Sequence, residues 1–197
     1  MNSQMKIWAA LIVIIQLLTG CWVVNPRFVK EPKKDAKPIK VSKEYQVLGK
    51  YNALRACYDV LHYGIEIEPN PENKTIEGSV VFTCRLDSVS DSLQFDLHKN
   101  LDVKGIYVKN DTEPIPFSRN LRAIQFSIED YEINKGDVFR YRVEYGGKAM
   151  KAKRPPWKGG TVWKKDKNKN PWLGVACETM GASVWVPCKD HNLDEAD

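Results

Sequence analysis

Few residues in this sequence have types and spacing that could do chemistry, and none of them forms a complete catalytic set. The three histidines are His62, His98 and His191, and none belongs to an H-E-x-x-H arrangement that would hold zinc from one helix face. A G-x-S-x-G nucleophile turn, a P-loop and a dinucleotide fingerprint are also missing from the sequence. His62 and His98 fall on the polar sides of alternating runs, which predicts solvated surface histidines.

Cysteine is the next residue type with chemistry of its own, and the chain has five. None lies at C-x-x-C spacing, which argues against a zinc knuckle. Cys84 lies on the apolar side of an alternating run, where a buried free thiol is expected. An oxidising compartment would permit disulfides among Cys57, Cys84, Cys177 and Cys188, and their spacing leaves all three full pairings open.

Residues 1–20 have the features of a removable export signal. Lys6 precedes an apolar run at 7–18 that is interrupted only by Gln16. A helix of this length spans roughly 18 Å at ~1.5 Å per residue, which is shorter than the ~30 Å hydrocarbon core of a bilayer. The segment therefore predicts a cleaved leader rather than a transmembrane anchor.

The end of this leader resembles the bacterial lipobox. Its residues are Leu18-Thr19-Gly20-Cys21, a branched apolar residue and two small ones before cysteine. The resemblance implies that Cys21 is lipidated and that the protein is exported and anchored in the bacterial cell envelope. Trp22, in place of Asp, resembles the pattern of lipoproteins sorted to the outer membrane. The alternative is an ordinary secretory cleavage beside an incidental cysteine.

The formal net charge of +5 is unevenly distributed along the chain. Residues 25–50 carry eight basic and three acidic side chains, whereas residues 51–197 carry 21 basic and 22 acidic ones. The near-neutral second region argues against a face for duplex nucleic acid. The prolines and lysines of residues 21–50 predict an extended basic tether beside a membrane.

Residues 51–197 fit one domain by length, and their apolar residues recur with a period of two. Half-buried strands are predicted around 58–67, 76–86, 93–97, 124–128 and 139–145, with a Pro- and Asn-rich turn at 69–73. No stretch shows a helical apolar stripe. The fold class predicted is all-β, an antiparallel sandwich or a strongly curved, saddle-like sheet.

A basic insertion at 148–170 interrupts this alternation. Nine basic residues in 148–169 face one acid, Asp166, and the prolines and glycines predict a loop that carries Trp157 and Trp163. Interleaved basic and aromatic residues could bind single-stranded nucleic acid. That partner is not expected for an exported lipoprotein, so an insertion that packs its tryptophans on a neighbouring domain is favoured.

The segment 171–191 resembles the M1 family of zinc aminopeptidases, at the end of that family's N-terminal β domain. In the family a Glu or Gln stands nine residues before a Pro-Cys-x-Asp motif, and here Glu178 precedes Pro187-Cys188-Lys189-Asp190 by that spacing. The runs 58–63 and 76–80 resemble the family's opening strands. The run 155–160 resembles a bacterial subgroup of lipoprotein-type members. The chain departs from the family pattern at Val186, where Phe is common, and at Asp190-His191-Asn192, which stands in place of Asp-Glu-Pro.

This resemblance implies that Glu178 binds the free α-ammonium of a peptide substrate. It implies a zinc cofactor in a full-length parent, because the G-x-M-E-N and H-E-x-x-H motifs that do the chemistry are not in this sequence. We therefore expect the N-terminal portion of a lipid-anchored aminopeptidase, cut off before its catalytic domain. By itself it would be catalytically inactive and would bind no zinc.

The alternative is a stand-alone β-sandwich lipoprotein that binds peptide or protein, with Trp172, Trp185 and Val186 as an apolar contact surface.

Overall fold

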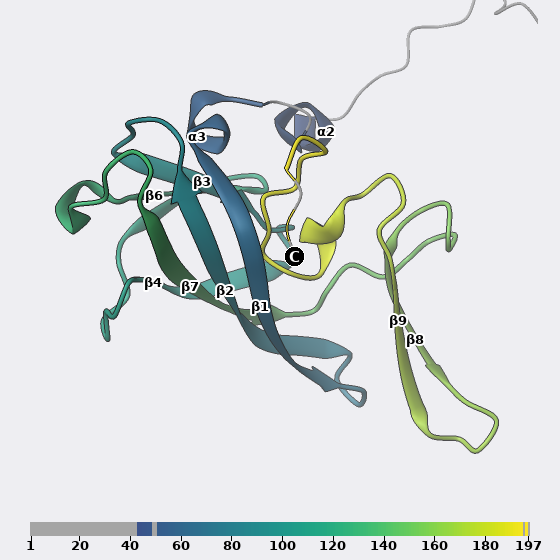
Figure 1. Ribbon diagram of the computed structural model, residues 1–197. Coiled ribbons are helices and arrows are strands. Elements are labelled where there is room, and N and C mark those ends of the chain that lie inside the picture. The colour runs from purple at the N-terminus through teal and green to yellow at the C-terminus, as the bar shows by residue number, and fades with distance from the viewer. Residues whose placement is uncertain (1–42, 49–50, 195, 197) are drawn as a thin grey trace, which may run out of the picture. The chain divides into compact units, whose positions relative to one another are not determined.

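The computed structural model describes residues 43–48, 51–194 and 196, and these residues form mainly antiparallel β-structure (Figure 1). The all-β prediction is confirmed. The helical elements are α2 (Lys43–Leu48), α3 (Ala53–Ala56) and short 3-10 turns at Glu129–Tyr131 and Ala182–Val184. The strands are β1 (Tyr58–Asn70), β2 (Thr75–Leu86), β3 (Ser92–Asp96), β4 (Leu101–Val108), β5 (Phe117–Asn120), β6 (Ala123–Ser127), β7 (Val138–Gly147), β8 (Gly160–Lys165) and β9 (Pro171–Ala176).

Two sheets share one aromatic core. The order β1-β2-β7-β4 makes the larger sheet and β3-β6-β5 the smaller one, with every pairing antiparallel. Phe82 of β2 stacks on Tyr141 of β7 with 4.3 Å between ring centroids, and Tyr141 lies 5.0 Å from the ring of Phe126 on β6. Rings from both sheets therefore pack together in one core between the sheets, as in a β-sandwich. We call β1–β7 (residues 58–147) the body.

A bulge in β1 changes which residues of that strand face the core. Tyr58 and Val60 are buried, and the pairing with β2 then shifts between Val60 and His62. After the extra residue, Tyr63 and Ile67 pack against the core instead. One inserted residue reverses the inward face because successive side chains point to opposite sides of a strand.

Part of the basic insertion forms β8, the first strand of a β-hairpin, where the sequence predicts a loop. Strands β8 and β9 pair from Gly160 with Ala176 to Lys165 with Pro171. Trp163 and Leu173 pack against the core of the body. Aromatic and β-branched residues favour strands, so this short run of them forms a hairpin despite the lysines around it.

Short helices precede the body. Helix α2 lies within the region predicted to be an extended tether, and Asn52 caps α3 by accepting a hydrogen bond from the Arg55 amide at 3.1 Å. Among the described residues, no helix is both long and apolar enough to cross a membrane. Cys21, the leader and residues 21–42 of the tether lie outside the described residues.

The cysteines of the described region are free thiols. Cys57, Cys84 and Cys188 are buried, while Cys177 is exposed. Burial raises the pKa of the Cys84 thiol, because a thiolate would lose its hydration there.

Candidate functional site

Glu178 stands in a tight turn at the end of β9. We call residues 177–181 the Glu178 turn. The amides of Met180 and Gly181 both donate to the carbonyl of Cys177, at 3.0 and 2.9 Å. The side chain of Glu178 is exposed and has no hydrogen bond or ion pair to any residue that the structure describes. The turn therefore presents an accessible carboxylate.

The loop before β8 packs against this turn. The Gly159 amide donates to the carbonyl of Glu178 at 3.2 Å. A side chain at Gly159 would collide with the carbonyl oxygen of Ala176, so this close approach requires glycine. Trp157, two residues earlier, keeps 65% of its surface exposed. The insertion is thus joined by its backbone to the candidate site.

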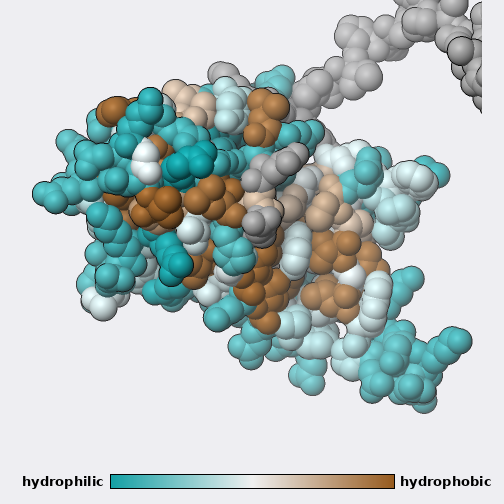
Figure 2. All heavy atoms as spheres, in the orientation of Figure 1, coloured by the Kyte–Doolittle hydropathy of each residue, from teal (hydrophilic) through white to brown (hydrophobic). Residues whose placement is uncertain are grey.

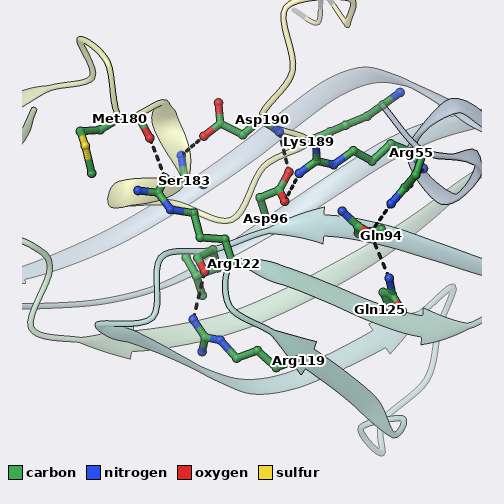
Figure 3. A network of polar contacts seen from close by, with 12 residues as sticks. Arg55, Gln94, Asp96, Arg119, Arg122, Gln125, Met180, Ser183, Lys189 and Asp190 are labelled. Atoms are coloured by element: carbon green, nitrogen blue, oxygen red, sulfur yellow. Dashed lines mark hydrogen bonds and ion pairs between the residues drawn. The ribbon is translucent and has the colours of Figure 1, made fainter. Parts of the chain in front are cut away.

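A buried arginine supports the turn from inside (Figure 3). Arg122 is 1% exposed and donates to the carbonyl of Met180 at 2.6 Å and to the hydroxyl of Ser183 at 3.1 Å. Hydrogen bonds from charged donors are stronger than those between neutral groups. Because both acceptors lie in or next to the Glu178 turn, Arg122 fixes its backbone.

Asp190 holds the other end of the turn. Its carboxylate accepts a hydrogen bond from the Ser183 amide at 3.0 Å. Gly181 has φ +75°, and a side chain there would collide with the Asp190 carboxylate. The turn therefore needs glycine for two reasons, its left-handed backbone and the carboxylate beside it.

Beneath Asp190 lies a buried ion pair between Arg55 and Asp96, both fully buried (Figure 3). The second carboxylate oxygen of Asp96 accepts from the Asp190 amide at 3.1 Å. Loss of hydration raises the pKa of Asp96 to about 6, although the Arg55 charge opposes this shift. This pair connects α3, β3 and the C-terminal segment.

The Pro-Cys-x-Asp motif has a structural role here. The backbone of Cys188 pairs with that of Asp96, at 2.8 and 3.1 Å. Lys189 is buried, donates to the carbonyl of Tyr58 and forms an ion pair with Asp194 at 3.2 Å. The Lys189 amide also donates to the hydroxyl of Tyr63 at 3.0 Å. The motif thus fastens the segment after the Glu178 turn to β1 and β3.

The structure corrects one histidine prediction. His98 is buried, not solvated, and its amide donates to the carbonyl of Ser183 at 2.7 Å. Residues 93–98, which comprise most of β3 and the two residues after it, are all buried, so alternation could not separate inside from outside here. His62 is exposed as predicted, and His191 is partly buried against the ring of Tyr51.

The apolar patch of the alternative interpretation is smaller than the sequence suggests. Trp172 is 51% exposed and Trp185 is half-buried, whereas Val186 is buried and part of the core. Sequence analysis missed Arg55, Asp96, Arg122 and Lys189 because their partners lie far away along the chain.

The described residues present an exposed carboxylate at Glu178. They hold no group of three His, Cys, Asp or Glu side chains that could bind a metal ion. A zinc site of the kind the motif resemblance implies does not fit them. A surface hollow of about 430 Å³ between Glu66, Glu77, Lys104 and Glu144 shares no residue with the Glu178 turn.

Known structures share this fold. A mutant M1 zinc metallopeptidase from Deinococcus radiodurans, bound to a Tyr-Ser-Ala substrate, matches with a TM-score of 0.54 and 18% identity, over 71% of this chain and 30% of that one. Yeast leukotriene A4 hydrolase in complex with bestatin matches with a TM-score of 0.53 and 16% identity, over 80% and 26%. The chain has the fold of an M1 metallopeptidase N-terminal domain.

This M1-like fold agrees with the resemblance carried by Glu178 and the Pro-Cys-x-Asp motif. No family model matches the sequence, and no curated protein matches it by sequence. The chain spans less than a third of the length of these two known structures. The likeness therefore establishes the fold, while the activity has to be argued from the site.

Proposed function

We propose that this chain is the N-terminal, substrate-binding domain of a zinc aminopeptidase that removes N-terminal residues from peptides. Glu178 binds the α-ammonium of the peptide. The single observation that carries the proposal is the exposed Glu178 carboxylate, which has no partner among the described residues and lies on a turn that Arg122 and Asp190 hold in place. The M1-like fold supports the same role.

The chemistry of an ammonium group explains why such a carboxylate selects peptide ends. A free N-terminus can donate charge-assisted hydrogen bonds to Glu178 at about 2.7–2.9 Å. An internal peptide bond has no charge to offer and would leave the acid without its partner. The fixed turn reduces the ordering cost of binding, because Arg122 and Asp190 already hold the backbone.

Bond cleavage lies outside the described residues in this proposal. Zinc would supply it in a longer product by activating a water molecule. Sequencing the reading frame beyond codon 197 tests this directly. A frame that continues into G-x-M-E-N and H-E-x-x-H supports the aminopeptidase. A native product that ends at Asp197 favours the alternative, a β-sandwich module that binds peptide or protein.

Peptide binding to the present chain tests Glu178. Binding of a tripeptide with a free amine, followed by NMR shifts, should weaken at least about tenfold in Glu178→Gln, because a charge-assisted hydrogen bond is worth about 1.5–3 kcal/mol. Glu72→Gln changes another exposed glutamate, in the turn between β1 and β2, and should have no effect. Equal binding of the N-acetylated tripeptide would contradict the proposal.

Export and lipid anchoring form a separate part of the proposal. The leader at 1–20 and the lipobox-like run before Cys21 support them. The predicted location is the cell envelope, at the outer membrane. Radiolabelled palmitate should enter the parent chain and not Cys21→Ser, and unlabelled parent protein would contradict lipidation.

A further inference from the structure

The residues before and along the β8–β9 hairpin form a concentrated positive region. We call residues 148–169 the cationic segment; it contains nine basic side chains and one acid. The other residues of 51–197 contain 12 basic and 21 acidic side chains. Every basic side chain of the cationic segment is exposed. An anionic surface would attract this region and repel the rest of the domain.

The positive charges of the cationic segment are not neutralised within the described fold. Its one acid, Asp166, accepts hydrogen bonds from the amides of Asn168 and Asn170, both at 2.8 Å, which lowers the pKa of that carboxyl. None of the nine basic residues forms an ion pair with a residue that the structure describes. The lysines therefore remain available to an external partner.

Two exposed tryptophans accompany these charges. Trp157 is 65% exposed, and Trp172 is 51% exposed on the outward face of β9. The ring of Trp172 lies over Gly174, where a side chain would collide with it. Lys164 pairs with Trp172 across the hairpin. An exposed indole thus lies opposite an exposed lysine on the neighbouring strand of the hairpin. In Figure 2 the end of the hairpin, at lower right, is covered by hydrophilic residues.

We infer that the cationic segment and Trp172 dock the domain on an anionic lipid bilayer. Lysines near a membrane are attracted to anionic headgroups, and tryptophan rings concentrate at the headgroup level of bilayers. The inference rests on the export and anchoring part of the proposed function, because a lipid on Cys21 would keep the domain next to a bilayer. It does not depend on the role of Glu178.

Vesicle binding by the full chain carrying Cys21→Ser tests this without acylation. The vesicles are phosphatidylcholine alone or phosphatidylcholine with about one-third phosphatidylglycerol. Lys165→Gln/Lys167→Gln should weaken binding to the anionic vesicles about twenty-five-fold, since each lysine near the surface contributes about fivefold. Lys74→Gln/Lys135→Gln removes two exposed charges from the body and should leave binding unchanged.

Trypsin provides a local measurement that the leader and the tether do not affect. Anionic vesicles should slow cleavage after Lys164, Lys165 and Lys167 several-fold, while neutral vesicles should not, and Trp172→Ala should reduce the protection. Two results would overturn the inference. One is an equal loss of vesicle binding in both charge variants, and the other is a hairpin whose trypsin sites anionic vesicles leave unprotected. Lysine-dependent binding of a single-stranded oligonucleotide with no response to vesicles would also overturn it. Glu178→Gln should bind vesicles like the parent, which separates this test from that of the amine site.

Discussion

The body and the β8–β9 hairpin are both antiparallel β-structure, but they are stabilised in different ways. In the body, apolar side chains alternate with polar ones, and Phe82, Val80 and Val143 are fully buried. The hairpin reaches the core mainly through Trp163 and Leu173, which are only partly buried. Its first strand is also held by the Thr161 backbone, which exchanges hydrogen bonds with Met150 and Ala152 at 2.7 and 2.9 Å.

This difference shows how one domain can combine a well-packed apolar core with an exposed, charged hairpin. Free energy of unfolding comes mainly from buried apolar area, which the body supplies. The hairpin buries little, so its exposed positions can carry charge at small cost to folding. The Glu178 turn lies between these regions, because Gly159 of the insertion and Arg122 of the body both bond to it.

The largest expected effect is the contrast between two aromatic truncations. Phe82→Ala should lower the free energy of unfolding by about 3–5 kcal/mol, because it leaves a cavity among stacked rings. Trp172→Ala should cost less than about 1 kcal/mol, since half of the indole is already exposed. Urea denaturation of the two variants measures both values. A Trp172→Ala cost as large as that of Phe82→Ala would show that the hairpin belongs to the main core.

The next effect concerns pH and the buried Asp96 within the body. Its folded pKa of about 6 lies above the unfolded value of about 3.9. The folded chain therefore binds more protons between pH 4 and 6, so stability falls as pH rises through this window, by about 3 kcal/mol in order of magnitude. Unfolding free energies measured from pH 4 to 7 should show this fall in the parent and not in Asp96→Asn.

Two features of this pH experiment keep its outcome clear. Asp96→Asn removes the Asp96 carboxylate at every pH, so the free energy of unfolding of this variant carries no contribution from Asp96 titration, whatever the loss of the Arg55–Asp96 ion pair costs. Asp130→Asn changes an exposed carboxyl and should keep the shape of the parent curve. Parallel curves for the parent and Asp96→Asn would show that Asp96 stays ionised throughout.

Alternation predicts the body because its strands are amphipathic. Ile76, Val80, Phe82 and Leu86 of β2 are buried as the period of two requires. The same rule fails at β1, where the bulge between Val60 and His62 reverses the inward face. A bulge depends on the pairing of two strands, and nothing in the local sequence of β1 marks it.

The buried polar network could not be predicted for a related reason. Asp96 and His98 occupy polar positions of a regular run, and only tertiary contacts with Arg55 and Ser183 explain their burial. The position of Glu178 came from a motif resemblance, and the structure adds that its side chain is exposed. Its role in amine binding stays a prediction, because the conformation of the turn does not by itself show which ligand the carboxylate binds.

The smallest effect separates the hairpin from the body at Gly159. Gly159→Ala would force a methyl group against the Ala176 carbonyl, so we expect β8–β9 amides to exchange hydrogen about tenfold faster, a local cost of about 1.4 kcal/mol. Gly64→Ala is the matched control, because its methyl group would have ordinary contacts, the nearest at 3.6 Å from Val81 Cβ. Amides of β2 and β7 should exchange at an unchanged rate in both variants.

Faster exchange throughout the body of Gly159→Ala would mean that the hairpin and the sandwich open as one cooperative unit. In that case Glu178 would be positioned by the whole domain and not by the local contacts of its turn.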